Sequence, residues 1–115
     1  MTTRKILCVD GDSNARQILA RMLAELGYSV TLSETAGQAL DCLASGDIDG
    51  VLVEYDLPDE TGGRLRADIK DLWPDLPVLM FAGVGPQTPF MLRFFDAYLR
   101  HAELPSGNSL QDLVG

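Results

Sequence analysis

The chain is short of the residues that build several kinds of functional site. Its two cysteines, Cys8 and Cys42, lie in apolar segments without the close spacing of a zinc site, so we expect buried thiols, no disulfide and no zinc. Basic residues are also few, because nine lysines and arginines stand against 17 aspartates and glutamates and leave a net charge of −8. A polyanion is repelled at long range by such a domain, and we expect no binding of nucleic acid.

Long apolar runs are absent as well. The first apolar stretch, residues 6–9, is far shorter than the roughly 20 residues of a membrane-spanning helix, and it is too short for a signal peptide. We therefore expect no membrane association and a cytoplasmic location. An apolar content of 46% in 115 residues is enough to bury one core, which predicts a single domain over residues 1–115.

Apolar residues follow strand and helix patterns in alternation along the chain. Short apolar runs predict buried strands, and apolar residues that recur every three or four positions predict helices. The predicted strands are residues 5–9, 28–32, 51–53, 77–81 and 97–100. The predicted helices are residues 13–26, 36–45, 65–72, 90–95 and 109–114, of which the last is short. This alternation predicts βαβ units and a parallel sheet that is covered by helices on both faces.

Polar residues mark the ends of the predicted helices. Asp12 or Ser13 is placed to accept hydrogen bonds from the first turn of the first helix, and Gly27 is placed to end that helix in the left-handed conformation. Thr35 begins a capping-box pattern ahead of the second helix.

Carboxylates gather where the predicted strands end. Asp10 and Asp12 follow the first strand, and Glu54 and Asp56 follow the third. In parallel sheets of this type, ligands bind at the carboxyl ends of the strands. We expect these four acids to meet there, together with the loop that begins at residues 82–83.

Three segments resemble the receiver domains of two-component response regulators. They are residues 6–12, which end in acids, residues 54–58, in which the Glu54 carboxylate lies four residues before Pro58 and Gly62 follows, and residues 76–80. The resemblance extends over nearly the whole chain. It implies a (βα)5 flavodoxin-like fold, a doubly wound parallel sheet with strand order 2-1-3-4-5, here with a shortened last helix.

In that family, acids after the first strand and an aspartate at the end of the third bind Mg²⁺, and the aspartate accepts a phosphoryl group from a histidine kinase. Asp10 matches the first acid, but Gly11 stands where the second usually lies, which leaves Asp12 as its substitute. Glu54 occupies the phosphoacceptor position, where its extra methylene moves the carboxylate by about 1.5 Å. The family resemblance thus implies a metal site formed by Asp10, Asp12 and Glu54 that binds Mg²⁺ weakly at most.

The remaining two family positions are a hydroxyl residue after the fourth strand and a lysine after the fifth, both of which contact the phosphoryl oxygens. Ala82 takes the hydroxyl position and has no side-chain donor. The lysine position falls on His101 if the fifth strand is residues 97–100, or on Leu104 if no gap is allowed. We prefer His101.

These departures together predict a pseudo-receiver, a non-enzymatic signalling domain that requires no cofactor and lacks the usual phosphorylation. Glu54 is expected to be a solvated carboxylate, and the alternative is that it imitates a phosphorylated aspartate. The expected partner is a protein: a histidine kinase, another regulator or an output domain. The apolar segment 90–101 is either ordinary core or a docking face, including a homodimer face. The rival function is a metal-dependent hydrolase that uses the acidic cluster.

Overall fold

The computed structural model describes residues 3–102, which form a four-stranded parallel sheet with four helices. The strands are β1 (Lys5–Val9), β2 (Ser29–Ser33), β3 (Gly50–Glu54) and β4 (Val78–Phe81), and they lie in the order β2-β1-β3-β4. The helices are α1 (Ser13–Glu25), α2 (Ala36–Ala44), α3 (Gly62–Leu72) and α4 (Thr88–Ala102). The predicted α/β flavodoxin-like fold and the order of its first four strands are confirmed.

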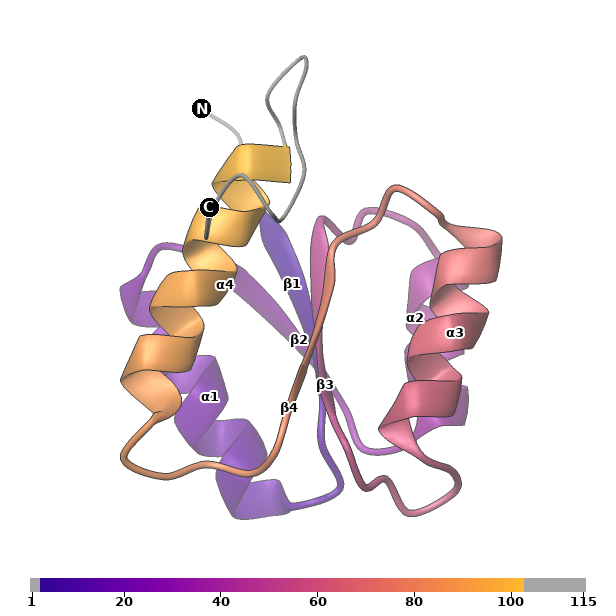
Figure 1. Ribbon diagram of the computed structural model, residues 1–115, viewed down its shortest axis with the longest axis horizontal. Helices are drawn as coiled ribbons and strands as arrows, with labels where there is room; N and C mark the ends of the chain where they lie inside the picture. The colour runs from indigo at the N-terminus through magenta and orange to yellow at the C-terminus, as the bar shows by residue number, and fades with distance from the viewer. Residues whose placement is uncertain (1–2, 103–115) are drawn as a thin grey trace.

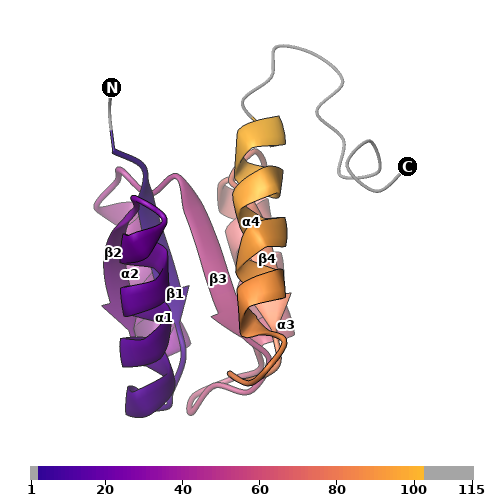
Figure 2. The same ribbon diagram turned by 90° about the vertical axis from the view of Figure 1, so that its left-hand side faces the viewer.

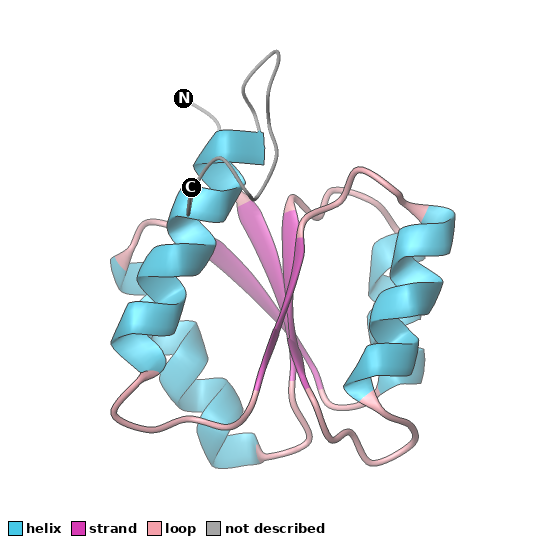
Figure 3. Ribbon diagram, in the orientation of Figure 1, coloured by secondary structure: helices cyan, strands magenta, loops and turns pink. Residues whose placement is uncertain are grey.

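Helices cover both faces of the sheet (Figure 1 and Figure 3). α1 and α4 lie on one face and α2 and α3 on the other, which is also visible in the view turned by 90° (Figure 2). Each face has its own apolar core, and the alternation of side chains along a strand divides β1 between them. Ile6 and Cys8 belong to the core under α1 and α4, and Leu7 and Val9 belong to the core under α2 and α3. This double burial explains why the sequence of β1 is continuously apolar.

The predicted ends of the first two helices are confirmed, whereas α3 begins at Gly62, three residues before the predicted start. The Asp12 carboxylate accepts hydrogen bonds from backbone N–H groups in the first turn of α1, and the Thr35 hydroxyl accepts one from Gln38 in α2. Gly27 has φ of 96°, the left-handed conformation that glycine adopts without strain at the end of a helix. None of the helices in residues 3–102 is long and apolar enough to cross a membrane.

The predicted fifth strand is wrong. Residues 97–100 belong to α4, which also contains the short helix predicted at residues 90–95. Its buried residues recur every three or four positions, as a helix requires, and no glycine or proline interrupts the segment after Pro89. These buried residues are Thr88, Leu92, Phe95 and Leu99. The helix predicted at residues 109–114 lies outside the described residues.

Helix α4 returns across the sheet on the same face as α1 (Figure 1). Phe95 and Leu99 pack over Gly50 at the start of β3, and the Tyr28 hydroxyl donates a hydrogen bond to Asp96. Burial and this hydrogen bond to a carboxylate both raise the pKa of Tyr28. Because no strand of residues 3–102 follows β4 in the sheet, β4 is an edge strand in the part of the chain that is described.

The close contact at Gly50 yields a test of the position of α4. A Cβ atom at this residue would lie 2.5 Å from Leu99 Cδ2 and 3.2 Å from Phe95 Cζ. We expect Gly50→Ala to lower the free energy of unfolding by about 1–3 kcal/mol, because overpacking forces the helix away from the sheet. Urea denaturation measures this change.

The matched control is Gly63→Ala in α3. A Cβ atom there would have only Met80 Cε near it, at 4.0 Å, and alanine favours a helix over glycine. We expect no loss of stability at this position. Equal stability of Gly50→Ala and the parent protein would show that α4 does not pack on β3 in this way.

Candidate functional site

The carboxyl ends of β1, β3 and β4 surround a pocket of about 600 Å³ whose lining includes four acidic residues. Asp10 comes directly after β1, Glu54 is the last residue of β3, and Gly83 lies just after β4. The predicted meeting of carboxylates at this edge is therefore present in the structure. The lining residues are Asp10, Gly11, Asp12, Ala15, Glu54, Asp56, Leu57, Pro58, Gly83 and Val84.

Asp10 is the buried acid of the pocket, with an exposure of only 3%. Its Oδ1 accepts a hydrogen bond of 2.8 Å from the Asp12 N–H, whereas no described group bonds to the buried Oδ2. Burial raises the pKa of Asp10, and the charges of Glu54 and Asp12 act in the same direction. Arg16 opposes this effect, and its Nη1 donates to the backbone oxygen of Asp10 at 2.7 Å.

The Asp12 carboxylate caps the first turn of α1. Its Oδ1 accepts hydrogen bonds from the N–H groups of Asn14, at 2.9 Å, and Ala15, at 3.5 Å, and so caps α1. The neighbouring Gly11 lies against Pro58, because a Cβ atom at residue 11 would be 2.9 Å from both Cγ and Cδ of the ring. An aspartate at residue 11 would therefore require Pro58 to move.

Glu54 reaches across the pocket to the loop after β4. Its Oε2 accepts a hydrogen bond of 2.6 Å from the Gly83 N–H, so the prediction of a merely solvated carboxylate is wrong. Gly83 has φ of 71°, which a glycine adopts without strain, and this conformation lets its N–H point at the carboxylate. Ala82, just before it, is exposed and adds no polar side-chain group.

Gly62 holds the start of α3 against the end of β3. Its N–H donates a 2.7 Å hydrogen bond to the Tyr55 oxygen, and a Cβ atom at residue 62 would collide with the Glu54 backbone oxygen. Only glycine permits this close approach of the two backbones. The position of the Glu54 backbone therefore depends on Gly62.

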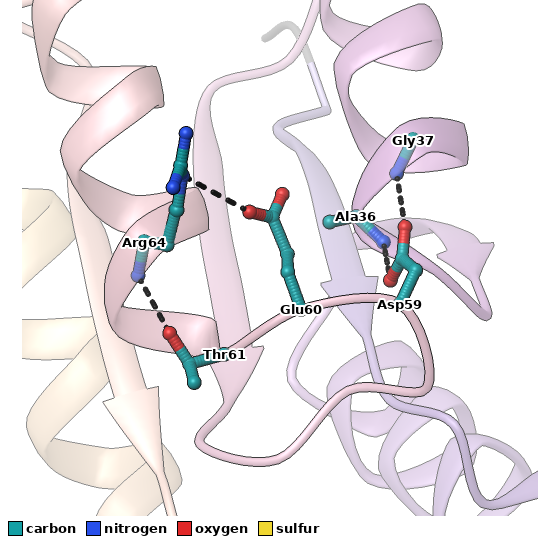
Figure 4. A network of polar contacts seen from close by, with 6 residues as sticks. All are labelled: Ala36, Gly37, Asp59, Glu60, Thr61 and Arg64. Atoms are coloured by element: carbon teal, nitrogen blue, oxygen red, sulfur yellow. Dashed lines mark hydrogen bonds and ion pairs between the residues drawn. The ribbon is translucent and has the colours of Figure 1, made fainter.

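A second carboxylate connects the loop after β3 to α2 (Figure 4). Asp59 Oδ1 accepts a 2.9 Å hydrogen bond from the Ala36 N–H, and Oδ2 accepts one of 3.1 Å from the Gly37 N–H. These two bonds satisfy donors at the first turn of α2 and place a negative charge at the positive end of its dipole. They lower the pKa of Asp59.

Comparison with known proteins identifies the family. Residues 6–98 match the response regulator receiver domain. The chain belongs to the response-regulator receiver-domain family. Receivers of this family serve in two-component signalling and are signalling domains, not an enzyme family.

Named relatives agree with this assignment. The DNA-binding transcriptional regulator NtrC of Rhizobium meliloti (strain 1021) is 36% identical over 91 residues, which are 79% of this chain and 18% of that protein. The response regulator TrrA from Thermotoga maritima, solved with Mg²⁺ and BeF, has a TM-score of 0.63 and 28% identity over 70% of this chain and 68% of its own. A complex of histidine kinase ThkA with TrrA gives a TM-score of 0.67 at 28% identity and covers 70% of this chain and 69% of the other. This receiver thus spans about a fifth of the length of the first of these relatives.

The structure corrects the assignment of the receiver lysine. His101 lies in the last turn of α4, about 20 Å along the helix from Thr88. The prediction that it replaces the lysine loses its basis, because that prediction required residues 97–100 to be a strand. The alternative, Leu104, lies outside the described residues. No lysine or arginine is among the pocket-lining residues of the described chain.

The donor set of this receiver does not fit a tightly held Mg²⁺. Asp10 and Glu54 present carboxylate oxygens to the pocket, but Asp12 caps α1 and one Glu54 oxygen is bound to Gly83. Among residues 3–102, no group of three or more histidines, cysteines, aspartates or glutamates is arranged to hold a metal ion. Since Mg²⁺ demands near-octahedral oxygen coordination, weak binding by Asp10, Asp12 and Glu54 stays our prediction.

Two residues of the site were not predicted from the sequence. Arg16 is the cation next to Asp10, and a signal for it exists, because it lies one helical turn after the capping Asp12. Asp59 carries no such signal, since it is more than 20 positions away from Ala36 and Gly37, whose N–H groups it binds. Only the folded chain brings them together.

The lowered pKa of Asp59 predicts a pH-dependent stability. The ionised carboxylate stabilises the folded state above its ordinary pKa of 3.8, and this contribution is lost as pH falls through the lower folded value. We expect Asp59→Asn to melt at a lower temperature than the parent at pH 7. The difference between the two proteins should shrink below about pH 3.8.

The control for this experiment is Asp41→Asn, which changes an exposed acid on α2 itself. Its melting temperature should follow that of the parent protein across the same pH range. A loss of stability in Asp59→Asn that is the same at pH 7 and pH 3 would mean that the charge of Asp59 is not what anchors the loop.

Proposed function

We propose that this receiver has lost the phosphoryl-transfer chemistry of its family and works as a pseudo-receiver through contact with another protein. The observation that carries the proposal is the hydrogen bond from the Gly83 N–H to Glu54 Oε2. It connects the residue at the phosphoacceptor position directly to the loop after β4. The loop is thereby held in one arrangement by the unmodified protein.

The groups around Glu54 support the loss of chemistry. Phosphoryl transfer requires a nucleophile held in line and cations or donors on the transferring oxygens. The Glu54 carboxylate accepts a hydrogen bond from Gly83, and Ala82 supplies no hydroxyl. The Arg16 guanidinium, the cation beside Asp10, donates to the Asp10 backbone oxygen. A phosphoryl group on Glu54 Oε2 would have to displace the Gly83 contact, and one on Oε1 would remove the carboxylate charge that strengthens this hydrogen bond.

The pocket gives little support to the alternative of a metal-dependent hydrolase. Such enzymes need a well-furnished metal site and a cation for the substrate phosphate. The lining of this pocket has carboxylates with competing bonds and no lysine or arginine. Its charge would repel a phosphate substrate.

The partner that we propose is a histidine kinase, another regulator or an output domain. The support is that TrrA, a structural neighbour, was solved in complex with the histidine kinase ThkA, and that NtrC is a DNA-binding transcriptional regulator. The cytoplasmic location, the absence of nucleic-acid binding and the single domain over residues 1–115 stay predictions.

Treatment with acetyl phosphate and Mg²⁺ tests the proposed loss of chemistry. We expect no phosphoryl mass gain by intact mass spectrometry, because the acceptor and the groups that read it are altered. A phosphorylatable receiver in the same mixture controls for the reagent. A gain that Glu54→Gln or Asp56→Asn abolishes would refute the proposal and would identify the modified residue.

Amide exchange tests whether Glu54 holds the loop. A hydrogen bond to a charged group contributes about 1.5–3 kcal/mol, so Glu54→Ala should speed exchange of the Gly83 N–H by tenfold or more. Asp56→Ala is the matched control, since Asp56 lines the same pocket but makes no bond to Gly83. NMR-detected exchange that is equally fast in the parent and in Glu54→Ala would show that the contact does not persist in solution.

A further inference from the structure

The pocket at the carboxyl ends of β1, β3 and β4 carries an excess of negative charge. Its lining contains four acids, and none of the lining residues in the described chain is a lysine or an arginine. Two cations of the surrounding elements are engaged elsewhere. Arg16 donates to the Asp10 backbone oxygen, and Arg64, in the first turn of α3, pairs with Glu60 at 3.6 Å. A ligand of this pocket should therefore be positively charged.

The Asp10 carboxylate adds an observation that is independent of the total charge. Asp10 is only 3% exposed, and its Oδ1 accepts a hydrogen bond from the Asp12 N–H. Its Oδ2 is also buried, yet no group of the described chain donates to it. Burial of an acceptor without a donor costs free energy, and the cost is larger for a charged group. A ligand with an N–H donor would remove this cost.

The oxygens that remain favour an ammonium group over a guanidinium group. Oδ1 of Asp10 and Oε2 of Glu54 are bonded to backbone N–H groups, which leaves Asp10 Oδ2 and Glu54 Oε1 for a ligand. A guanidinium is a planar fork that suits both oxygens of one carboxylate. An ammonium is compact and directs three donors to separate acceptors. Single oxygens at the ends of two different strands match the ammonium.

The same two oxygens suit Mg²⁺ less well. Mg²⁺ demands near-octahedral coordination by oxygen and loses its water reluctantly. The donors of an ammonium rotate on a flexible stem and need no fixed coordination geometry. The mismatch with the metal is therefore no obstacle to an amine.

Apolar residues line the rest of the pocket. Leu57 and Pro58 belong to the loop after β3, Val84 follows β4, and Ala15 lies in the first turn of α1. A lysine side chain buries its aliphatic stem along apolar surface and carries its charge at the end. An alkyl stem with a terminal ammonium thus matches both parts of the lining.

We propose that the acidic pocket receives a lysine side chain of the partner protein. Its ammonium donates to Asp10 Oδ2 and Glu54 Oε1, and its stem lies against Leu57 and Val84. The inference rests on the proposed function, because it needs a protein partner, and it specifies the chemistry by which that partner is recognised. The hydrogen bond from Gly83 to Glu54 Oε2 is kept in this arrangement.

The probe is the capped tripeptide acetyl-Gly-Lys-Gly-amide, titrated into the full chain and followed by NMR. We expect saturable shifts of the Asp12 and Gly83 amides, because these N–H groups donate to the two carboxylates that bind the lysine. The same peptide with Nε-acetyllysine keeps the stem without the charge and should give no saturable shift. The absence of saturable shifts with the lysine peptide would overturn the proposal.

The length of the stem tests whether the ammonium reaches the buried oxygen. A peptide with α,γ-diaminobutyrate in place of lysine has a shorter stem and should bind about tenfold more weakly, since it loses a hydrogen bond to a charged group. An arginine peptide should also bind more weakly than the lysine peptide. Equal binding of the short peptide, or tighter binding of the arginine peptide, would contradict the proposed contacts.

Asp10→Asn and Asp41→Asn form a matched pair of variants, because each removes one carboxylate charge. Asp10→Asn should weaken binding of the lysine peptide by about tenfold, whereas Asp41→Asn, at an exposed site on α2, should leave it unchanged. Glu54→Gln should weaken binding as well and replaces Asp10→Asn if that variant does not fold. Equal losses at Asp41 and at the pocket would mean diffuse attraction without a site.

Two results would assign the pocket to another ligand and so overturn the proposal. Tighter binding of putrescine than of the lysine peptide at physiological salt would point to a free amine, and displacement of the peptide by micromolar Mg²⁺ would point to the metal.

The acetyl phosphate experiment fails or succeeds separately. A phosphoryl mass gain would refute the loss of chemistry while the unmodified protein still bound the peptide. A missing peptide shift without a mass gain would refute the lysine site alone.

Discussion

The close packing of α4 on the bare backbone of Gly50 determines much of this structure. Phe95 and Leu99 can reach the sheet there because no side chain intervenes. The helix after β4 consequently lies on the same face of the sheet as α1, and not on the face that α3 covers. The position of His101 in the last turn of α4, and not after a fifth strand, goes with this placement.

The acidic pocket combines the usual edge of a parallel sheet with carboxylates that already accept hydrogen bonds from the chain. Parallel strands bring Asp10 and Glu54 to the same edge of the sheet whatever their function. Local bonds then decide what the carboxylates can do: Asp12 stabilises a helix, Glu54 stabilises a loop, and Asp10 is left buried with one oxygen that no described group contacts. These bonds are what support the proposal of a pseudo-receiver.

The sequence allowed the first four strands and three helices to be predicted because their apolar patterns are unambiguous. β1 and β3 are short, continuous apolar runs, and capping residues such as Asp12 and Thr35 mark the helix starts. Residues 97–100 were misread because a four-residue window of apolar and aromatic residues fits a strand as well as a helix. The bonds from Glu54 to Gly83 and from Asp59 to α2 join residues more than 20 positions apart, so no local pattern could reveal them.

The contact between Gly11 and Pro58 joins the loop after β1 to the loop after β3. A side chain at residue 11 would meet the proline ring at 2.9 Å, so a second acid cannot return while that ring keeps its place. Any side chain at residue 11 therefore requires a movement of Pro58 or of the loop that carries it. The loops after β1 and β3 are in this way coupled by shape alone, so a substitution beside Asp10 would be transmitted to the loop that begins at Glu54 without any polar contact between them.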